Sequence, residues 1–197
     1  MSTRQARVVY IDDLIKECIS RAYTEVKNRR KDDLTKKEMD KIAEIIGIGA
    51  LRFNIIKVQP EKDIVFKWEE ALNFEGFSAP FIQYAHARTC GILSKSSFEK
   101  KTFNPTFLIH DSEVKLVKSI SKFPLIINEA CENFRPHILT SYLFELASFF
   151  NQFYRDCPVI PEENKDIRNA RLGLVEATKT VLCNGLNLLG IIAPREM

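Results

Sequence analysis

The sequence predicts an all-α protein, in which an antiparallel helix bundle follows a smaller helical region. Two observations favour this fold. In two long segments near the end of the chain, apolar residues recur at every third or fourth position, which is the pattern of an amphipathic helix. The loops between such segments are short, and amphipathic helices joined by short loops pack as an antiparallel bundle. We expect the bundle to cover residues 77–197.

The smaller region, residues 11–76, begins with a predicted helix. Asp12 and Asp13 are suited to its first turn, because short acidic side chains accept hydrogen bonds from the free backbone amides there. The helix is expected to run to about Arg30, and a polar turn is expected at residues 27–33. Its apolar stripe consists of Leu14, Cys18, Ala22 and Val26.

A second helix is predicted from Thr35 to about Ile46. Thr35 and Glu38 form the Thr-x-x-Glu pattern of a capping box, in which each residue satisfies a backbone amide of the other. The sequence Gly47-Ile48-Gly49 then indicates either a helix break or a tight helix crossing, before the apolar segment ALRFNIIKV.

The next part of the chain holds a linker and two shorter helices. Residues 59–63 (QPEKD) are typical of a linker. A short helix is expected from Trp68 to Gly76, because glycine favours the conformation that closes a helix. Pro80 is suited to the first turn of a helix that ends near Leu93.

Residues 94–110 are predicted to be the longest irregular segment, and further helices follow it. They are expected at 111–123, 124–134, 136–156 and 164–189. The last two carry the clearest apolar stripes. The stripes consist of Leu139, Tyr142, Leu143, Leu146, Phe149, Phe150, Phe153 and Cys157, and of Ala170, Leu174, Ala177, Val181 and Leu188.

The charge of the chain is concentrated near its beginning. Residues 1–41 contain 11 Lys/Arg and 8 Asp/Glu, which accounts for the whole net charge of +3. Residues 42–197 contain equal numbers of basic and acidic residues and so have no net charge. We therefore expect any nucleic acid to be recognised more by shape and stacking than by a basic surface. Five cysteines without a CxxC pair are typical of buried thiols in a reducing compartment. No membrane-spanning segment or signal peptide is indicated, so we expect a cytoplasmic protein.

Most patterns of enzyme chemistry are missing from the sequence. Gly47-x-Gly49 lacks a preceding strand and a third glycine, so it does not indicate a dinucleotide site. His86, His110 and His137 are too far apart for a metal site, and none is expected. No nucleophile motif or phosphate-binding loop occurs. We therefore expect no catalytic residues in this chain.

Two sets of residues are candidates for binding RNA. Lys115, Lys118 and Lys122 share a helix face and are candidate phosphate contacts, although a solvated helix face is the more common explanation. Aromatic residues exceed what one apolar stripe can bury, and Tyr154 stands at a helix end beside Arg155. Exposed aromatic side chains next to arginine can stack on single-stranded bases.

The segment FKWEEALNFEGFSAPFIQYAHAR (residues 66–88) resembles arginyl-tRNA synthetases, where it joins the catalytic core to the anticodon-binding bundle. Residues 135–159 and 171–197 are similar to the long helices of the DALR anticodon-binding domain. Residues 11–26 and 46–56 are similar to the helices that follow the ATP-binding loop. The resemblance covers the chain in collinear order. It implies that residues 77–197 form a DALR domain and that residues 11–76 contact the tRNA stem.

The resemblance also implies roles for individual residues. In the family, aromatic and apolar side chains hold the anticodon loop, and the matching positions here are Tyr84, Tyr154 and Met197. Phe81 stands where the family often has Tyr, and it keeps the stacking face. Arg88 lies one helical turn beyond Tyr84, so its guanidinium can join the same surface.

Residues 1–10 resemble a remnant of the KMSKS loop, which stabilises ATP phosphates in the family. MSTRQA aligns Ser2, Thr3 and Arg4 with this loop, but Gln5 replaces a basic residue and Ala6 replaces a glycine. The Rossmann core and the HIGH signature have no counterpart in the sequence. ATP and arginine are therefore expected to bind only through a catalytic domain that this chain does not contain.

Two functions follow from these observations as alternatives. The first is binding of the tRNA-Arg anticodon, as the C-terminal part or a stand-alone relative of the synthetase, supporting arginine-tRNA ligation with a separate catalytic chain. The second is a helical interaction module that has lost RNA binding and forms a homodimer or a complex with another protein. Its contact surface would be the apolar region around residues 40–75, which is left without its catalytic domain.

Overall fold

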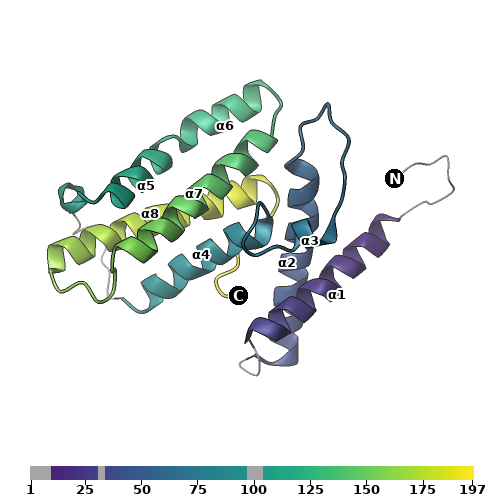
Figure 1. Ribbon diagram of the computed structural model, residues 1–197, viewed down its shortest axis with the longest axis horizontal. Coiled ribbons are helices and arrows are strands. Elements are labelled where there is room, and N and C mark those ends of the chain that lie inside the picture. Colours follow the sequence, from purple (N-terminus) through teal and green to yellow (C-terminus); the bar gives the residue numbers. More distant parts are fainter. Residues whose placement is uncertain (1–9, 31–33, 97–103) are drawn as a thin grey trace.

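The computed structural model describes residues 10–30, 34–96 and 104–197 (Figure 1). Within these ranges the chain is helical and contains no strand, so the all-α prediction is confirmed. The helices are α1 (Ile11–Arg30), α2 (Lys36–Ile56), α3 (Trp68–Ala71), α4 (Ala79–Ser94), α5 (Asp111–Ser121), α6 (Phe123–Glu132), α7 (His137–Asp156) and α8 (Lys165–Leu188), with a 3-10 turn at Pro105–Phe107.

Helices α1 and α2 form a hairpin beside the bundle (Figure 1). The capping box at the start of α2 is confirmed: Glu38 Oε2 accepts the Thr35 N–H at 2.9 Å, and Thr35 Oγ1 accepts the Glu38 N–H at 3.4 Å. The predicted stripe of α1 also faces inward, since Cys18, Ala22 and Val26 are buried. Ala22 and Val26 pack with Ile42, Ala43 and Ile46 from the first half of α2 in a small core of their own.

Gly47 lies at a close approach of the two helices of the hairpin. A Cβ atom at this position would lie 2.8 Å from the backbone N and Cα atoms of Ile19, so only glycine fits. Helix α2 continues through this crossing to Ile56. Of the two alternatives predicted for Gly47-Ile48-Gly49, the tight crossing is confirmed and the helix break is wrong.

The bundle consists of α4, α5, α6, α7 and α8, with α7 and α8 at its centre (Figure 1). The stripe predicted for α7 is buried, except that Phe149 is only half-buried. Phe53 of α2 is 1% exposed and belongs to the core of the bundle, although Ile42 and Ile46 of the same helix belong to the hairpin core. Helix α2 therefore contributes to both cores.

Several local predictions are wrong. Helix α3 ends at Ala71 instead of Gly76, because Asn73 starts a turn in which its side-chain oxygen accepts the Glu75 N–H at 2.8 Å. Residues 27–30 extend α1 instead of forming a turn, and residues 31–33 lie outside the described ranges.

The stripe predicted for α8 is partly out of phase. Ala170 and Leu174 are buried as expected, but Leu188 is 62% exposed and the inward positions nearby are Leu182 and Leu186. A residue two positions beyond Leu186 is rotated by about 200° around the helix, which turns Leu188 to solvent.

Helix α8 ends in a left-handed glycine that redirects the chain. Gly190 has φ +67°, its N–H donates to Asn187 O, and the Ile191 N–H donates to Leu186 O, which is the Schellman arrangement. The chain then runs back towards α4 and α2, where it ends (Figure 1). Among the described helices, none is both long and apolar enough to span a lipid bilayer.

Candidate nucleic-acid interface

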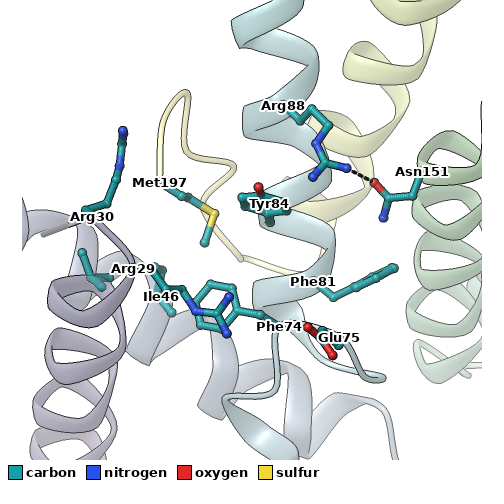
Figure 2. A pocket seen from close by; sticks show the side chains of 11 residues that line it. Arg29, Arg30, Ile46, Phe74, Glu75, Phe81, Tyr84, Arg88, Asn151 and Met197 are labelled. Carbon is teal, nitrogen blue, oxygen red and sulfur yellow. Dashed lines mark hydrogen bonds between the residues drawn. The ribbon is translucent and has the colours of Figure 1, made fainter. Parts of the chain in front are cut away.

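Helix α4 carries aromatic and basic residues on one face and buried polar residues on another. Phe81, Tyr84 and Arg88 lie at successive turns along one face of α4, and Arg88 reaches across to Asn151 of α7 (Figure 2). Gln83 and His86 lie on the other face and are buried, with exposed fractions of 0% and 3%. The sequence FIQYAHAR thus supplies an open surface and a buried polar pair from one helix.

Arg88 holds two tyrosines together. Its Cζ lies 4.7 Å from the ring centroid of Tyr84 and 5.2 Å from that of Tyr154, which comes from the end of α7. Its Nη1 donates to Asn151 Oδ1 at 2.7 Å (Figure 2). The two tyrosines remain 42% and 44% exposed. The result is a fixed cationic and aromatic platform whose outer surfaces are open to a ligand.

A cavity of about 670 Å³ adjoins this platform. It lies between the end of α1, helix α4 and the last residues of the chain (Figure 2). Met197 enters it from the final segment and also packs against the core of the hairpin. The lining residues are Val26, Arg29, Arg30, Ile46, Phe74, Glu75, Phe81, Tyr84, Arg88, Asn151 and Met197.

The charged groups of the cavity are mainly positive. The side chains of Arg29, Arg30 and Arg88 line it, and Glu75 is the one acidic side chain among the lining residues. The Arg29 guanidinium lies 4.3 Å from the ring centroid of Phe74, so it too is paired with an aromatic face. The Nε of Arg30 is buried and has no hydrogen-bond partner among the described residues. Such a cavity suits a ligand that combines flat rings with negative charge.

The structure brings together the five residues predicted to hold an anticodon loop. Phe81, Tyr84, Arg88 and Met197 line the cavity, and Tyr154 joins them through Arg88. Phe81 is half-buried, and its ring packs against that of Phe144 with a centroid separation of 4.9 Å. The roles of these residues remain predictions, but their common location does not depend on the resemblance.

The other candidate residues lie elsewhere. Lys115, Lys118 and Lys122 are exposed on α5 and at its end, and α7 and α8 lie between α5 and α4 (Figure 1). The lysines therefore do not join the cavity. Ser2, Thr3 and Arg4 lie outside the described residues. In the part of the chain that the structure describes, no cluster of His, Cys, Asp and Glu is arranged to hold a metal ion.

Sequence reasoning missed four residues of the site. Arg29 and Arg30 were predicted in a turn and Phe74 in a short helix, so none of the three was expected to line the same cavity as Tyr84. Asn151 precedes Tyr154 by three positions, one helical turn, and this spacing was an available signal. The positions of Arg29 and Arg30 depend on how α1 packs against the bundle, which no local pattern indicates.

Comparison with known families identifies the bundle. The model of the DALR anticodon binding domain matches residues 82–197, more than half of the chain. The chain belongs to the DALR anticodon-binding domain family. Residues 1–68 match a second model, the catalytic domain of class I tRNA synthetases (R).

Individual relatives of this DALR chain agree with the family assignment. It is 48% identical over 197 residues to the arginine–tRNA ligase of Methanocella arvoryzae and 44% identical over 203 residues to that of Methanosarcina mazei. Both alignments cover 100% of this chain but only 34% and 35% of the relatives. The chain thus spans about a third of the length of the curated relatives it matches.

Solved structures show the same fold. The arginyl-tRNA synthetase of Thermus thermophilus superposes with a TM-score of 0.89 at 33% identity, covering 96% of this chain and 32% of that one. For the Plasmodium falciparum enzyme the TM-score is 0.85 at 27% identity, with 96% and 34% covered. The resemblance to the C-terminal part of arginyl-tRNA synthetases is confirmed: the end of a class I catalytic domain precedes a DALR domain.

Proposed function

We propose that the chain binds the anticodon loop of tRNA-Arg at the platform of Tyr84, Arg88 and Tyr154 and in the adjoining cavity. The observation that carries this proposal is the position of Arg88, whose guanidinium lies over both exposed tyrosines. RNA-binding proteins read single-stranded loops by stacking unpaired bases on aromatic rings and guanidinium planes. The DALR domain is an anticodon-binding domain by its family description.

Each tyrosine offers the exposed part of its ring to a base. Arg88 covers one face of each ring, so a base cannot enter between Tyr84 and Tyr154 without displacing it. The exposed parts of the two rings are available to two separate bases, and Asn151 keeps the guanidinium in place. The Tyr154 ring is also supported from the core by Phe150, which stacks beside it with a centroid separation of 6.3 Å. Stacking of one base on an aromatic side chain contributes about 1–3 kcal/mol. Two such contacts supply much of the affinity that a chain of low net charge needs.

The cavity supplies the electrostatic part of binding. A phosphate that follows a stacked base can be neutralised by Arg29 or Arg30, which line the cavity from α1. Lys115, Lys118 and Lys122 stay candidate phosphate contacts for a different part of a whole tRNA, because they are exposed on the far side of α7 and α8.

Support of arginine–tRNA ligation is the wider role that we propose. The similar proteins are named arginine–tRNA ligases and are about three times as long. Positioning the anticodon fixes the orientation of the tRNA, which lowers the entropic cost of bringing its acceptor end to a reaction centre. The catalytic part, including the sites for ATP and arginine, would come from sequence beyond these residues or from a separate chain.

The experiment is a titration of the chain with tRNA-Arg and with other tRNAs. Tyr84→Ala and Tyr154→Ala should each weaken binding of tRNA-Arg by roughly 5- to 100-fold, the range expected for loss of one stacked base. Phe134→Ala is a matched control, because Phe134 is an 85% exposed aromatic residue at the opposite end of α7 from Tyr154. Equal weak binding of all tRNAs, without an effect of either tyrosine, would contradict the proposal.

Exposed apolar residues also favour the second candidate function, a helical interaction module. Ile55, Ile64 and Val65 are 40%, 48% and 69% exposed within the region where an apolar contact surface was predicted. Such a surface promotes association with a second copy or with another chain. Light scattering would then give a dimer mass, and no tRNA would bind. A monomer with selective affinity for tRNA-Arg would exclude this candidate.

A further inference from the structure

The final segment of the chain, residues 190–197, connects the two cores. Ile191 is 1% exposed and belongs to the core of the bundle. Met197 packs against the core of the hairpin and lines the cavity beside Tyr84 (Figure 2). The position of Met197 in the cavity thus depends on how this short segment without regular structure is held.

Three side chains hold the segment through alternate carbonyl groups. His86 must carry its proton on Nδ1, since a carbonyl oxygen only accepts. The bonds are Arg52 Nη1 to Gly190 O, Gln83 Nε2 to Ile192 O at 2.8 Å, and His86 Nδ1 to Pro194 O at 2.7 Å.

Two of these donors are buried and do not line the cavity. Gln83 is 0% exposed and His86 is 3% exposed, although both alternate with cavity residues along α4. A buried polar side chain is costly unless it forms hydrogen bonds. The bonds of Gln83 go to the final segment and, at 3.4 Å, to Ile45 O of α2. The amide therefore ties α2, α4 and the final segment together.

Gly49 provides the space for this contact. A Cβ atom at Gly49 would lie 2.9 Å from Gln83 Nε2 and 3.1 Å from Ile191 Cγ2. Both distances are too short for unstrained contact, so glycine lets the amide and the final segment approach α2. The two glycines of Gly47-Ile48-Gly49 thus serve different contacts: the first admits α1, and the second admits Gln83 and Ile191.

We infer that Arg52, Gln83 and His86 are positioning residues, which fix Met197 in the RNA-binding cavity by holding the carbonyl groups of the final segment. None of them faces the cavity, so they act on a ligand only through Met197. The consequence for RNA rests on the proposed function, whereas the position of Met197 can be tested without RNA.

The position of Met197 can be followed by NMR of protein labelled with methyl-¹³C methionine. The sequence contains 3 methionines, so the spectrum is simple and Met197→Ala assigns the signal. Gln83→Leu and Arg52→Ala should move it to the position of a solvent-exposed methionine. His86→Asn retains an N–H donor and should leave it in place, as should Arg135→Ala, which removes another exposed arginine. An unchanged signal in both Gln83→Leu and Arg52→Ala would overturn the inference.

RNA affinity tests the coupling to Met197. Met197→Ala should weaken binding of an anticodon hairpin roughly 5- to 10-fold, as expected for loss of a few tens of Å² of apolar contact. Gln83→Leu should weaken hairpin binding by the same factor. The double variant Gln83→Leu/Met197→Ala should bind the hairpin no more weakly than either single variant. If the two factors multiply instead, Gln83 acts independently of Met197 and the inference is wrong.

Circular dichroism of the variants and the RNA affinity of Tyr84→Ala distinguish a folding defect, a failure of the proposed function and a failure of this inference. Arg52 is exposed, so Arg52→Ala replaces Gln83→Leu in the cycle if the buried substitution prevents folding, which circular dichroism reports. If Tyr84→Ala has no effect on RNA affinity, the proposed function fails. The methyl signal of Met197 still decides whether the three donors position this residue.

Discussion

At the scale of single residues, Arg171 connects three elements of the bundle. Its Nε donates to Glu113 Oε1 at 2.6 Å, and its Nη1 donates to Glu162 Oε2 and to Pro158 O, both at 2.7 Å. Glu113 is 0% exposed and also caps α5, since its other oxygen accepts the His110 N–H. Glu162, which comes from the loop between α7 and α8, thus takes part in the same network.

Replacing Arg171 by methionine should strongly destabilise the protein. The substitution keeps much of the side-chain volume but leaves the Glu113 carboxylate buried without its cation, which typically costs about 3–5 kcal/mol. Urea unfolding followed by circular dichroism measures the loss. Lys67→Ala, which removes the exposed partner of Glu70, should leave the unfolding midpoint unchanged. Equal effects of the two substitutions would show that burial does not matter here.

His86 should make stability depend on pH. Burial lowers its pKa from the ordinary value of 6.5, and the positive charges of Lys179 and Arg195 act in the same direction, against the bond to Pro194 O. Below pH 6.5 the unfolded chain therefore binds a proton more readily than the folded one, so stability falls as the pH drops through this value. Urea midpoints at pH 8 and pH 5.5 should differ more for the native sequence than for His86→Asn. An identical difference in both proteins would contradict this assignment.

At the scale of helices, the starts were more predictable than the ends. Thr35 with Glu38, Pro80 and Asn164 are local signals, and the structure places helix starts at each of them. The end of α3 was missed because the turn at Asn73 depends on a side-chain bond rather than on glycine. The phase of α8 near Leu188 was missed because several rotations of the helix satisfy a loose apolar pattern.

The glycines of the helices provide a matched pair of substitutions. Alanine normally stabilises a helix by about 1 kcal/mol over glycine. Gly91→Ala in α4 should show this gain, because nothing lies within 4 Å of the added Cβ. Gly47→Ala should instead lower the unfolding free energy by about 1–3 kcal/mol, because the Cβ would meet the backbone of Ile19 at 2.8 Å. A gain in stability at both positions would refute the tight crossing of α1 and α2.

At the scale of the whole molecule, the site is assembled from distant parts of the sequence. Arg29, Tyr84, Tyr154 and Met197 come from α1, α4, α7 and the final segment. The sequence showed which residue types suited RNA, and the resemblance supplied their grouping. It could not show that α1 contributes arginines, because this depends on contacts between elements far apart in the chain.

The two sets of basic residues should affect RNA binding differently. For a single-stranded loop, each lost phosphate contact lowers the slope of log K against log salt by about 0.7. Replacing Arg29 and Arg30 by alanine should therefore reduce the slope by roughly 1.4 for an anticodon hairpin. Replacing Lys115, Lys118 and Lys122 should change it only for whole tRNA, since α5 lies beyond α7 and α8. A larger effect of the lysines on the hairpin would place the loop on α5.

Helix α2 has a consequence for the modularity of this protein. Its first half is buried against α1, while Phe53 lies in the core of the bundle and Arg52 holds the final segment. A shortened chain that began after α2 would lack Phe53, so the bundle side chains that Phe53 covers would be exposed to solvent. It would also lack the Arg52 hydrogen bond to Gly190 O and the arginines of α1. The unit that could be transplanted to another protein as an RNA-binding module is therefore larger than the bundle and includes the hairpin.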